Sequence, residues 1–79
     1  MKKNDFFVHE TSIIDERVKI GKGTKIWHWC HILSNSKIGK NSTIGQGCFV
    51  GNNVIIGSNC KIQNNVSIFD GVKIEDGVF

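Results

Sequence analysis

The fold is decided by the stretch IGKNSTIGQGCFVGNNVIIGSNCKI, residues 38–62, in which isoleucine or valine recurs at every sixth position. The same spacing continues in both directions without an insertion, from Val8 to Ile74. Residues 8–79 therefore divide into twelve hexads, preceded by a lead-in of residues 1–7. Repetition at a fixed short period is typical of solenoids, in which each repeat packs only on its neighbours.

Each position of the hexad has a physical task. The β-branched residue favours a short extended segment. Four positions later comes a small or β-branched residue, such as Cys30, Ser42 or Val54, which we expect to point inward beside a corner. The position before it is Gly or Asn in nine of the twelve hexads, and these residues tolerate positive φ, so the turn is expected there. Trp29 occupies this slot in one hexad, where we expect backbone strain.

A strict period of six excludes the common alternatives. An α-helix has 3.6 residues per turn and cannot keep such a period on one face. A hairpin sheet needs longer strands and turns that reverse the chain. We therefore predict an all-β chain that winds in one direction with a corner every six residues, which is a parallel β-helix.

The hexads IGKGTK, IGKNST, IGQGCF and IGSNCK resemble those of the hexapeptide-repeat acyltransferases. This resemblance implies a left-handed β-helix of triangular section with three hexads per coil, so that twelve hexads make four coils of eighteen residues. It also implies a homotrimer. Members of this family are more than twice as long, so the β-helix of residues 8–79 is expected to be truncated at its C-terminal end.

A closer resemblance lies in IWHWCHI (26–32), IGKNSTIGQGCFVGN (38–52) and KIQNNVSIFDGVKIEDGVF (61–79). These segments are similar to the start of the UDP-2-acetamido-3-amino-2,3-dideoxyglucuronate N-acetyltransferases of bacterial surface-polysaccharide synthesis. The family implies transfer of acetyl from acetyl-CoA to the amino group of a UDP-3-amino sugar uronate, for lipopolysaccharide or O-antigen. Two alternatives stay open: a dTDP-3-amino-deoxyhexose acetyltransferase, and a catalytically incomplete fragment that only trimerises or binds sugar nucleotide. Whether this chain is active alone is open too.

Folding the repeat into three sides predicts where a ligand binds, because residues eighteen apart then stack. One corner stacks His28 and Trp29 with Gln46 and Asn64, and Trp27 lies just before it. Aromatic faces, amides and an imidazole suit a nucleotide base and its sugar. The predicted substrate-binding residues are Trp27, Trp29, Gln46, Asn64 and, at another corner, Asp70. The general-base candidates are His28 and His31, with His9 ranked below them because it lies in the first coil.

A second side of the helix is predicted to be an interface. Ile13, Leu33, Phe49 and Phe69 point outward there, because the core slots are already filled. An exposed apolar ladder usually marks a contact surface.

Other classes of function receive little support. The apolar runs are too short for a membrane helix, and the N-terminus lacks the apolar stretch of a signal peptide, so the expected location is the cytoplasm. The lysines are spread out, and a net charge of +3 does not by itself indicate nucleic acid. No zinc motif is present, and the spacing of His28 and His31 does not fit a γ-class carbonic anhydrase. Cys30 and Cys48 stack in adjacent coils, where a disulfide or two free thiols would fit.

Overall fold

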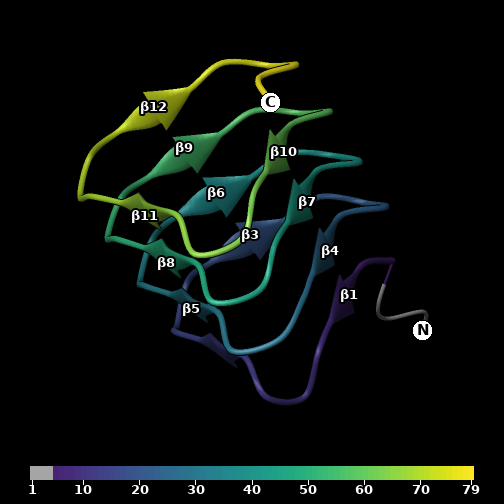
Figure 1. Ribbon diagram of the computed structural model, residues 1–79. Helices are drawn as coiled ribbons and strands as arrows, with labels where there is room; N and C mark the ends of the chain where they lie inside the picture. The colour runs from purple at the N-terminus through teal and green to yellow at the C-terminus, as the bar shows by residue number, and fades with distance from the viewer. Residues whose placement is uncertain (1–4) are drawn as a thin grey trace.

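The computed structural model describes residues 5–79, which form twelve two-residue strands and contain no helix (Figure 1). Residues 1–4 of the predicted lead-in lie outside the described residues. The strands are β1 (Phe7–Val8), β2 (Ile13–Ile14), β3 (Lys19–Ile20), β4 (Lys25–Ile26), β5 (His31–Ile32), β6 (Lys37–Ile38), β7 (Thr43–Ile44), β8 (Phe49–Val50), β9 (Ile55–Ile56), β10 (Lys61–Ile62), β11 (Ser67–Ile68) and β12 (Lys73–Ile74).

The strands form three parallel sheets, one on each side of the helix. Sheet A has the order β1-β4-β7-β10, sheet B the order β2-β5-β8-β11, and sheet C the order β3-β6-β9-β12. Each residue pairs with the residue eighteen positions later, as Ile26 does with Ile44. Figure 1 shows the coils stacked along one axis from the N-terminal to the C-terminal end. The predicted all-β parallel β-helix of four three-sided coils is confirmed, and its arrangement is that expected of the left-handed form.

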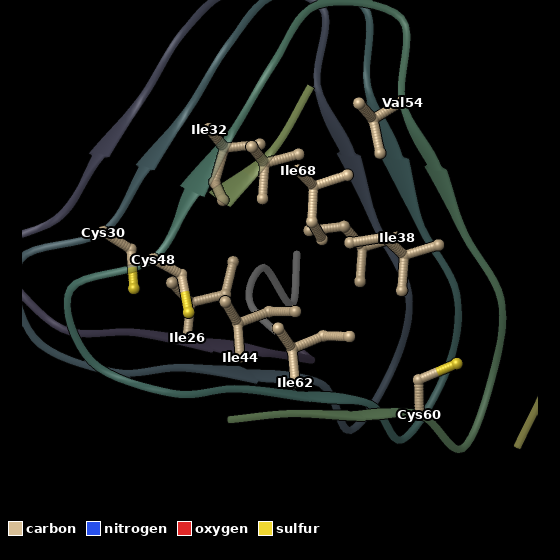
Figure 2. Packing of buried hydrophobic residues seen from close by; sticks show 12 residues of the cluster. Ile26, Cys30, Ile32, Ile38, Ile44, Cys48, Val54, Cys60, Ile62 and Ile68 are labelled. Carbon is tan, nitrogen blue, oxygen red and sulfur yellow. The ribbon is translucent and has the colours of Figure 1, made fainter. Parts of the chain in front are cut away.

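The core is a stack of the hexad aliphatics, seen along the axis in Figure 2. Ile26, Ile32, Ile44 and Val50 are fully buried. Burial decreases toward both ends, where Val8 and Ile74 are only partly covered. Burying such a side chain contributes about 1.5–3 kcal/mol, so the middle coils supply most of the stability.

The small inward residues do more than fit the corner. Ser42 Oγ donates to the carbonyl of Gly57 at 2.8 Å and accepts the amide of Cys60 at 3.1 Å. Ser36 bridges to the next coil in the same way, through the Gly51 carbonyl at 2.7 Å. The sequence pattern predicts only the size of these residues. Their hydroxyls pair backbone groups that would otherwise be buried without partners, which costs about 1–3 kcal/mol each.

All three cysteines are buried free thiols in this same inward position. Cys30 and Cys48 lie beside each other in adjacent coils, whereas Cys60 lies at another corner (Figure 2). Cys48 Sγ donates to the carbonyl of Gln63 at 3.0 Å. Burial raises the pKa of the Cys48 thiol above its ordinary value, because the thiolate would lose its hydration. The thiol therefore stays protonated at neutral pH and serves packing rather than nucleophilic chemistry.

The predicted turn slot has positive φ in every hexad from the second onward. Asparagine or glycine fills it in nine of these eleven positions, and Arg17 and Trp29 fill the others with φ of 61° and 60°. The first-hexad residue in this slot, Thr11, does not share the conformation. The left-handed conformation is thus imposed by the corner and not by the residue, so a bulky side chain in this slot is strained.

Glycines after the inward aliphatic allow the coils to stack closely. A Cβ on Gly39 would lie 2.7 Å from the Gly57 carbonyl carbon and the Ser58 amide nitrogen. We predict that Gly39→Ala lowers the free energy of unfolding by about 1–3 kcal/mol, the cost of overpacking. Urea unfolding followed by circular dichroism measures it. Lys37→Ala, an exposed change on β6 just before Gly39, is the control and should stay within about 0.5 kcal/mol of the wild type. Equal unfolding midpoints for the two variants would contradict this account of the glycine.

Candidate functional site

The predicted ligand corner, which we call the A–B corner, joins sheet A to sheet B. It consists of residues 10–11, 28–29, 46–47 and 64–65. Ile26 enters the core from β4, so that Trp27 is turned outward on the next position. Trp27 is 38% exposed, and its ring lies 5.5 Å from the Phe7 ring, measured between centroids, with the two planes tilted by 54°. The indole thus packs against the preceding coil while part of the residue stays open to solvent.

Next to Trp27, two imidazoles stack. The rings of His9 and His28 are 3.7 Å apart with an interplanar angle of 28°. The Trp27 and His28 rings are nearly parallel, at 10°, with centroids 6.4 Å apart. Phe7, His9, Trp27 and His28 therefore form one group, the aromatic cluster. His9 belongs to this cluster, although the sequence analysis ranked it below His28 and His31 as a general base. Its position eighteen residues before Trp27 places it next to Trp27 in the stack, and this spacing could have indicated its role.

Trp29 completes this corner at a conformational cost. Its φ of 60° lies in the left-handed region, as the strain prediction required, and 69% of the residue is exposed. Its amide donates to Thr11 Oγ1 at 2.8 Å, and Thr11 Oγ1 lies 3.0 Å from His9 Nδ1. Left-handed backbone costs a residue without special tolerance about 1–2 kcal/mol. A large indole that is both strained and exposed adds little to the stability of the fold, which favours a role in binding.

His31 lies beyond the corner, on sheet B, and has an acidic partner. Its Nε2 is 3.0 Å from Oδ1 of Asp15, and both side chains are part-buried. The Phe49 ring meets the imidazole edge to face, with centroids 6.4 Å apart. The structure therefore separates the two general-base candidates: His28 stacks in the aromatic cluster, whereas His31 forms a dyad with Asp15. Asp15 was not predicted as a site residue; its place one coil before His31, just after β2, was the only hint.

Two predicted binding residues contribute to the stacking of the coils. Asn64 Oδ1 accepts the amide of Gln46 at 3.0 Å. Asp70 Oδ1 accepts the amide of Asn52 at 2.8 Å. Asp70 lies at the corner between sheets B and C, so the structure does not bring it to the aromatic cluster. Gln46, Asn64 and Asp70 are exposed. A ligand would contact the side-chain amide of Gln46, the amide nitrogen of Asn64 and the second carboxylate oxygen of Asp70.

The predicted interface residues lie on the outer face of sheet B. Ile13 is 58% exposed and Phe69 is 70% exposed, while Phe49 and Leu33 are more covered. In the register of the sheet, Ile13 is followed by His31, Phe49 and Ser67. The apolar ladder is therefore interrupted by the His31 dyad, and any partner that covers this face also covers the dyad.

A hollow next to the aromatic cluster contains none of the site residues predicted from the sequence. It has a volume of about 170 Å³ and opens at the start of β1 and β4, lined by residues that include Asp5, Phe7 and Lys25. Within the described part of the chain, no three His, Cys, Asp or Glu side chains gather as metal ligands, and no helix could cross a membrane.

The strain at Trp29 generates a test. We predict that Trp29→Asn raises the free energy of unfolding by about 1 kcal/mol, because asparagine tolerates the left-handed conformation. Urea unfolding measures it. Trp29→Ala is the control, since it removes the ring but keeps a side chain that is disfavoured at positive φ, and it should bring no gain. A gain of the same size in both variants would show that loss of the ring, and not the backbone, is responsible.

Comparisons with known proteins agree with this architecture. Residues 17–52 match the family model described as bacterial transferase hexapeptide (six repeats). Among solved structures, one that is similar is an asparagine-for-histidine mutant of perosamine N-acetyltransferase from Caulobacter crescentus, in complex with CoA and GDP-perosamine. The TM-score is 0.66 at 22% sequence identity, over 89% of this chain.

This likeness shows a shared fold, and the present chain spans only 39% of that enzyme's chain. No curated protein matches the sequence significantly. Residues 17–52 therefore match the repeat that the family model describes, and in the structure the same six-residue unit continues over the rest of the β-helix.

Proposed function

We propose that the chain forms the nucleotide-sugar-binding coils of an acetyl-CoA-dependent N-acetyltransferase that acts on the amino group of a nucleotide-linked amino sugar. The observation that carries the proposal is the A–B corner, where the aromatic cluster and the strained, exposed Trp29 lie together. The fold shared with perosamine N-acetyltransferase, which was solved with CoA and GDP-perosamine, supports both substrates.

In this proposal the aromatic cluster and Trp29 bind the base. Base-to-aromatic stacking is worth about 1–3 kcal/mol per base. The Trp27 indole is held against Phe7, so little side-chain freedom is lost when a ring stacks on it. Gln46 and the free amide nitrogen of Asn64, one and two coils further along the corner, supply hydrogen bonds to the base or ribose.

His31 is the proposed general base and Asp15 its positioning residue. The amine nitrogen attacks the acetyl carbonyl carbon, the C–N bond forms, and the C–S bond breaks to release the CoA thiol. With Nε2 held by Asp15, Nδ1 of His31 accepts the proton that the amine gives up and passes it to the leaving thiolate. His28, whose ring faces are taken up by stacking, serves binding instead.

The finer identity of the acceptor rests on the sequence. The KIQNNVS segment supports a UDP-linked 3-amino sugar uronate of lipopolysaccharide or O-antigen synthesis in the cytoplasm. A dTDP-linked deoxyhexose is the alternative, and comparison of UDP, dTDP and GDP sugars in one assay separates them. The second candidate function is a β-helix that binds sugar nucleotide or trimerises without catalysis.

We further propose a homotrimer that packs through the outer face of sheet B, and expect sedimentation equilibrium to give the mass of three chains. Phe49→Asp should then yield monomers, because a buried unpaired carboxylate would face the partner. Ile55→Asp is the matched control: Ile55 holds the same hexad position on sheet C and is 44% exposed, so the trimer should persist. A monomeric wild type, or dissociation by both variants, would contradict the assignment of this face.

The dyad is tested by kinetics with acetyl-CoA and a UDP-3-amino sugar, following release of the CoA thiol. We predict that His31→Gln lowers kcat by about 10²–10⁴-fold, the usual contribution of a general base. Asp15→Asn should lower kcat less, by about tenfold, with KM little changed, because it only orients the imidazole.

Glu16→Gln is the control, since Glu16 is exposed and pairs only with its neighbour Arg17 among the described residues. A His31→Gln variant with full kcat would exclude the dyad as the base. A wild type that binds UDP but releases no thiol would favour the non-catalytic candidate.

A further inference from the structure

We infer that the outer face of sheet A binds the diphosphate of the nucleotide through Lys25, Thr43 and Lys61, which sets the direction in which the nucleotide lies on the helix. This inference rests on the proposed function, because it takes the ligand at the A–B corner to be a nucleotide. None of the three residues belongs to the site predicted from the sequence.

The three residues form one transverse row. Lys25 pairs with Thr43, and Thr43 pairs with Lys61, in the parallel register of β4, β7 and β10. Parallel strands lie about 4.8 Å apart, so a hydroxyl is flanked by two ammonium-bearing side chains. Each of these residues precedes a buried isoleucine and therefore faces outward. We call this set the phosphate row.

A second row of different chemistry runs parallel to the first. Two positions further along the same strands stand Trp27, Gly45 and Gln63. At about 3.3 Å per residue, this row lies roughly 6.6 Å from the phosphate row, about the width of a ribose. Gly45 is buried, and the side chain of Asn64 lies close over it. A base stacked on Trp27 would have its phosphates over Lys25 and Thr43, with the side-chain amide of Asn64 beside it.

The charge of this face favours an anion. Within residues 5–79, neither Lys25 nor Lys61 takes part in an ion pair, and no acidic side chain stands on the outward positions of β4, β7 and β10. One acidic residue, Asp5, lines the hollow next to Lys25, at the N-terminal end of the row. Two lysines on one small face repel each other unless a counter-charge lies between them. A diphosphate supplies that charge, and lysine binds phosphate as a point charge that does not require a fixed fork geometry.

Sheet C shows that lysines alone do not make this site. Lys19, Lys37 and Lys73 hold the same hexad position there, but the second row of that sheet is Gly21, Gly39, Gly57 and Glu75, with no aromatic ring. Only sheet A presents a cationic row and an aromatic row together on the described chain. Lys37 is therefore the matched control for Lys25: same position, same exposure class, and no ring beside it.

Tryptophan fluorescence provides a local reporter, because the full chain has two tryptophans and no tyrosine; Trp29 lies in the A–B corner and Trp27 just before it. The full chain is titrated with UDP, with uridine and with inorganic pyrophosphate at two salt concentrations. We expect UDP to bind more tightly than uridine, and its advantage to shrink at high salt. Lys25→Ala should weaken UDP binding about tenfold and leave uridine binding unchanged, with Lys61→Ala and Thr43→Val acting in the same direction.

Lys37→Ala should leave UDP binding as it is in the wild type. Circular dichroism checks that the variants stay folded, which is expected because both lysines are exposed. If Lys25→Ala and Lys37→Ala weakened UDP binding equally, the inference would be overturned, because the effect would then come from net charge and not from a phosphate site on sheet A. The proposal that a nucleotide binds at the A–B corner would not be affected by that result. Unchanged UDP affinity in Lys25→Ala and Lys61→Ala would overturn the inference too. Failure of the wild type to bind either UDP or uridine would reject the nucleotide site of the proposed function itself.

Discussion

The structure depends on one constraint, the eighteen-residue register in which each coil is hydrogen-bonded to the next. The amide of Trp27 donates to the carbonyl of Ile44 at 3.1 Å, and the amide of His31 donates to that of Cys48 at the same distance. Because this ladder repeats without an insertion, residues at one hexad position become neighbours along the axis. The inward aliphatic residues fill the core, and the glycines allow adjacent coils to approach each other closely. The outward residues form rows along each sheet, so the chemistry of the three sheets can be compared.

This regularity makes departures from the repeat informative. The turn slot holds asparagine or glycine in nine of the eleven hexads where φ is positive, but Trp29 fills it in one, with φ of 60° and the residue 69% exposed. Nothing in the packing of the fold requires that choice. The same coil holds His28, which stacks on His9 of the coil before, and, after the corner, His31, whose partner Asp15 also lies one coil earlier. The regular positions of the repeat supply the stability, whereas the proposed chemistry is centred on the coil that departs from the pattern.

The proposed site bends around a convex corner. The nucleotide lies on sheet A in this proposal, while the base that accepts the proton lies on sheet B, next to the apolar residues assigned to the trimer contact. A single β-helix presents these two faces at an angle to each other. In the proposed trimer a neighbouring copy covers sheet B, and the space between the two copies then brings the substrate amine toward His31. This geometry makes assembly a condition of catalysis in the proposal, and not only of stability.

The sequence by itself determined the period, the identity of the inward slots, the place of the turns and the residues that share each side. It did so because a constant six-residue spacing without insertions allows one register, and register decides which strands become neighbours. It also pointed to Trp27, Trp29 and His28 as the unusual residues of the A–B corner.

Only the tertiary structure decided which side chains touch. The side-chain oxygens of Asn64 and Asp70 accept backbone amides at the same position of the preceding coil. His9 on His28 and Asp15 on His31 are contacts between different positions of neighbouring coils. Such diagonal contacts depend on rotamers and on the geometry of the corner, which a repeat pattern does not encode. The hydrogen bonds of the inward hydroxyls and thiols could not be predicted from the sequence either. The repeat indicates that these residues are small, but it does not indicate which carbonyl each one donates to.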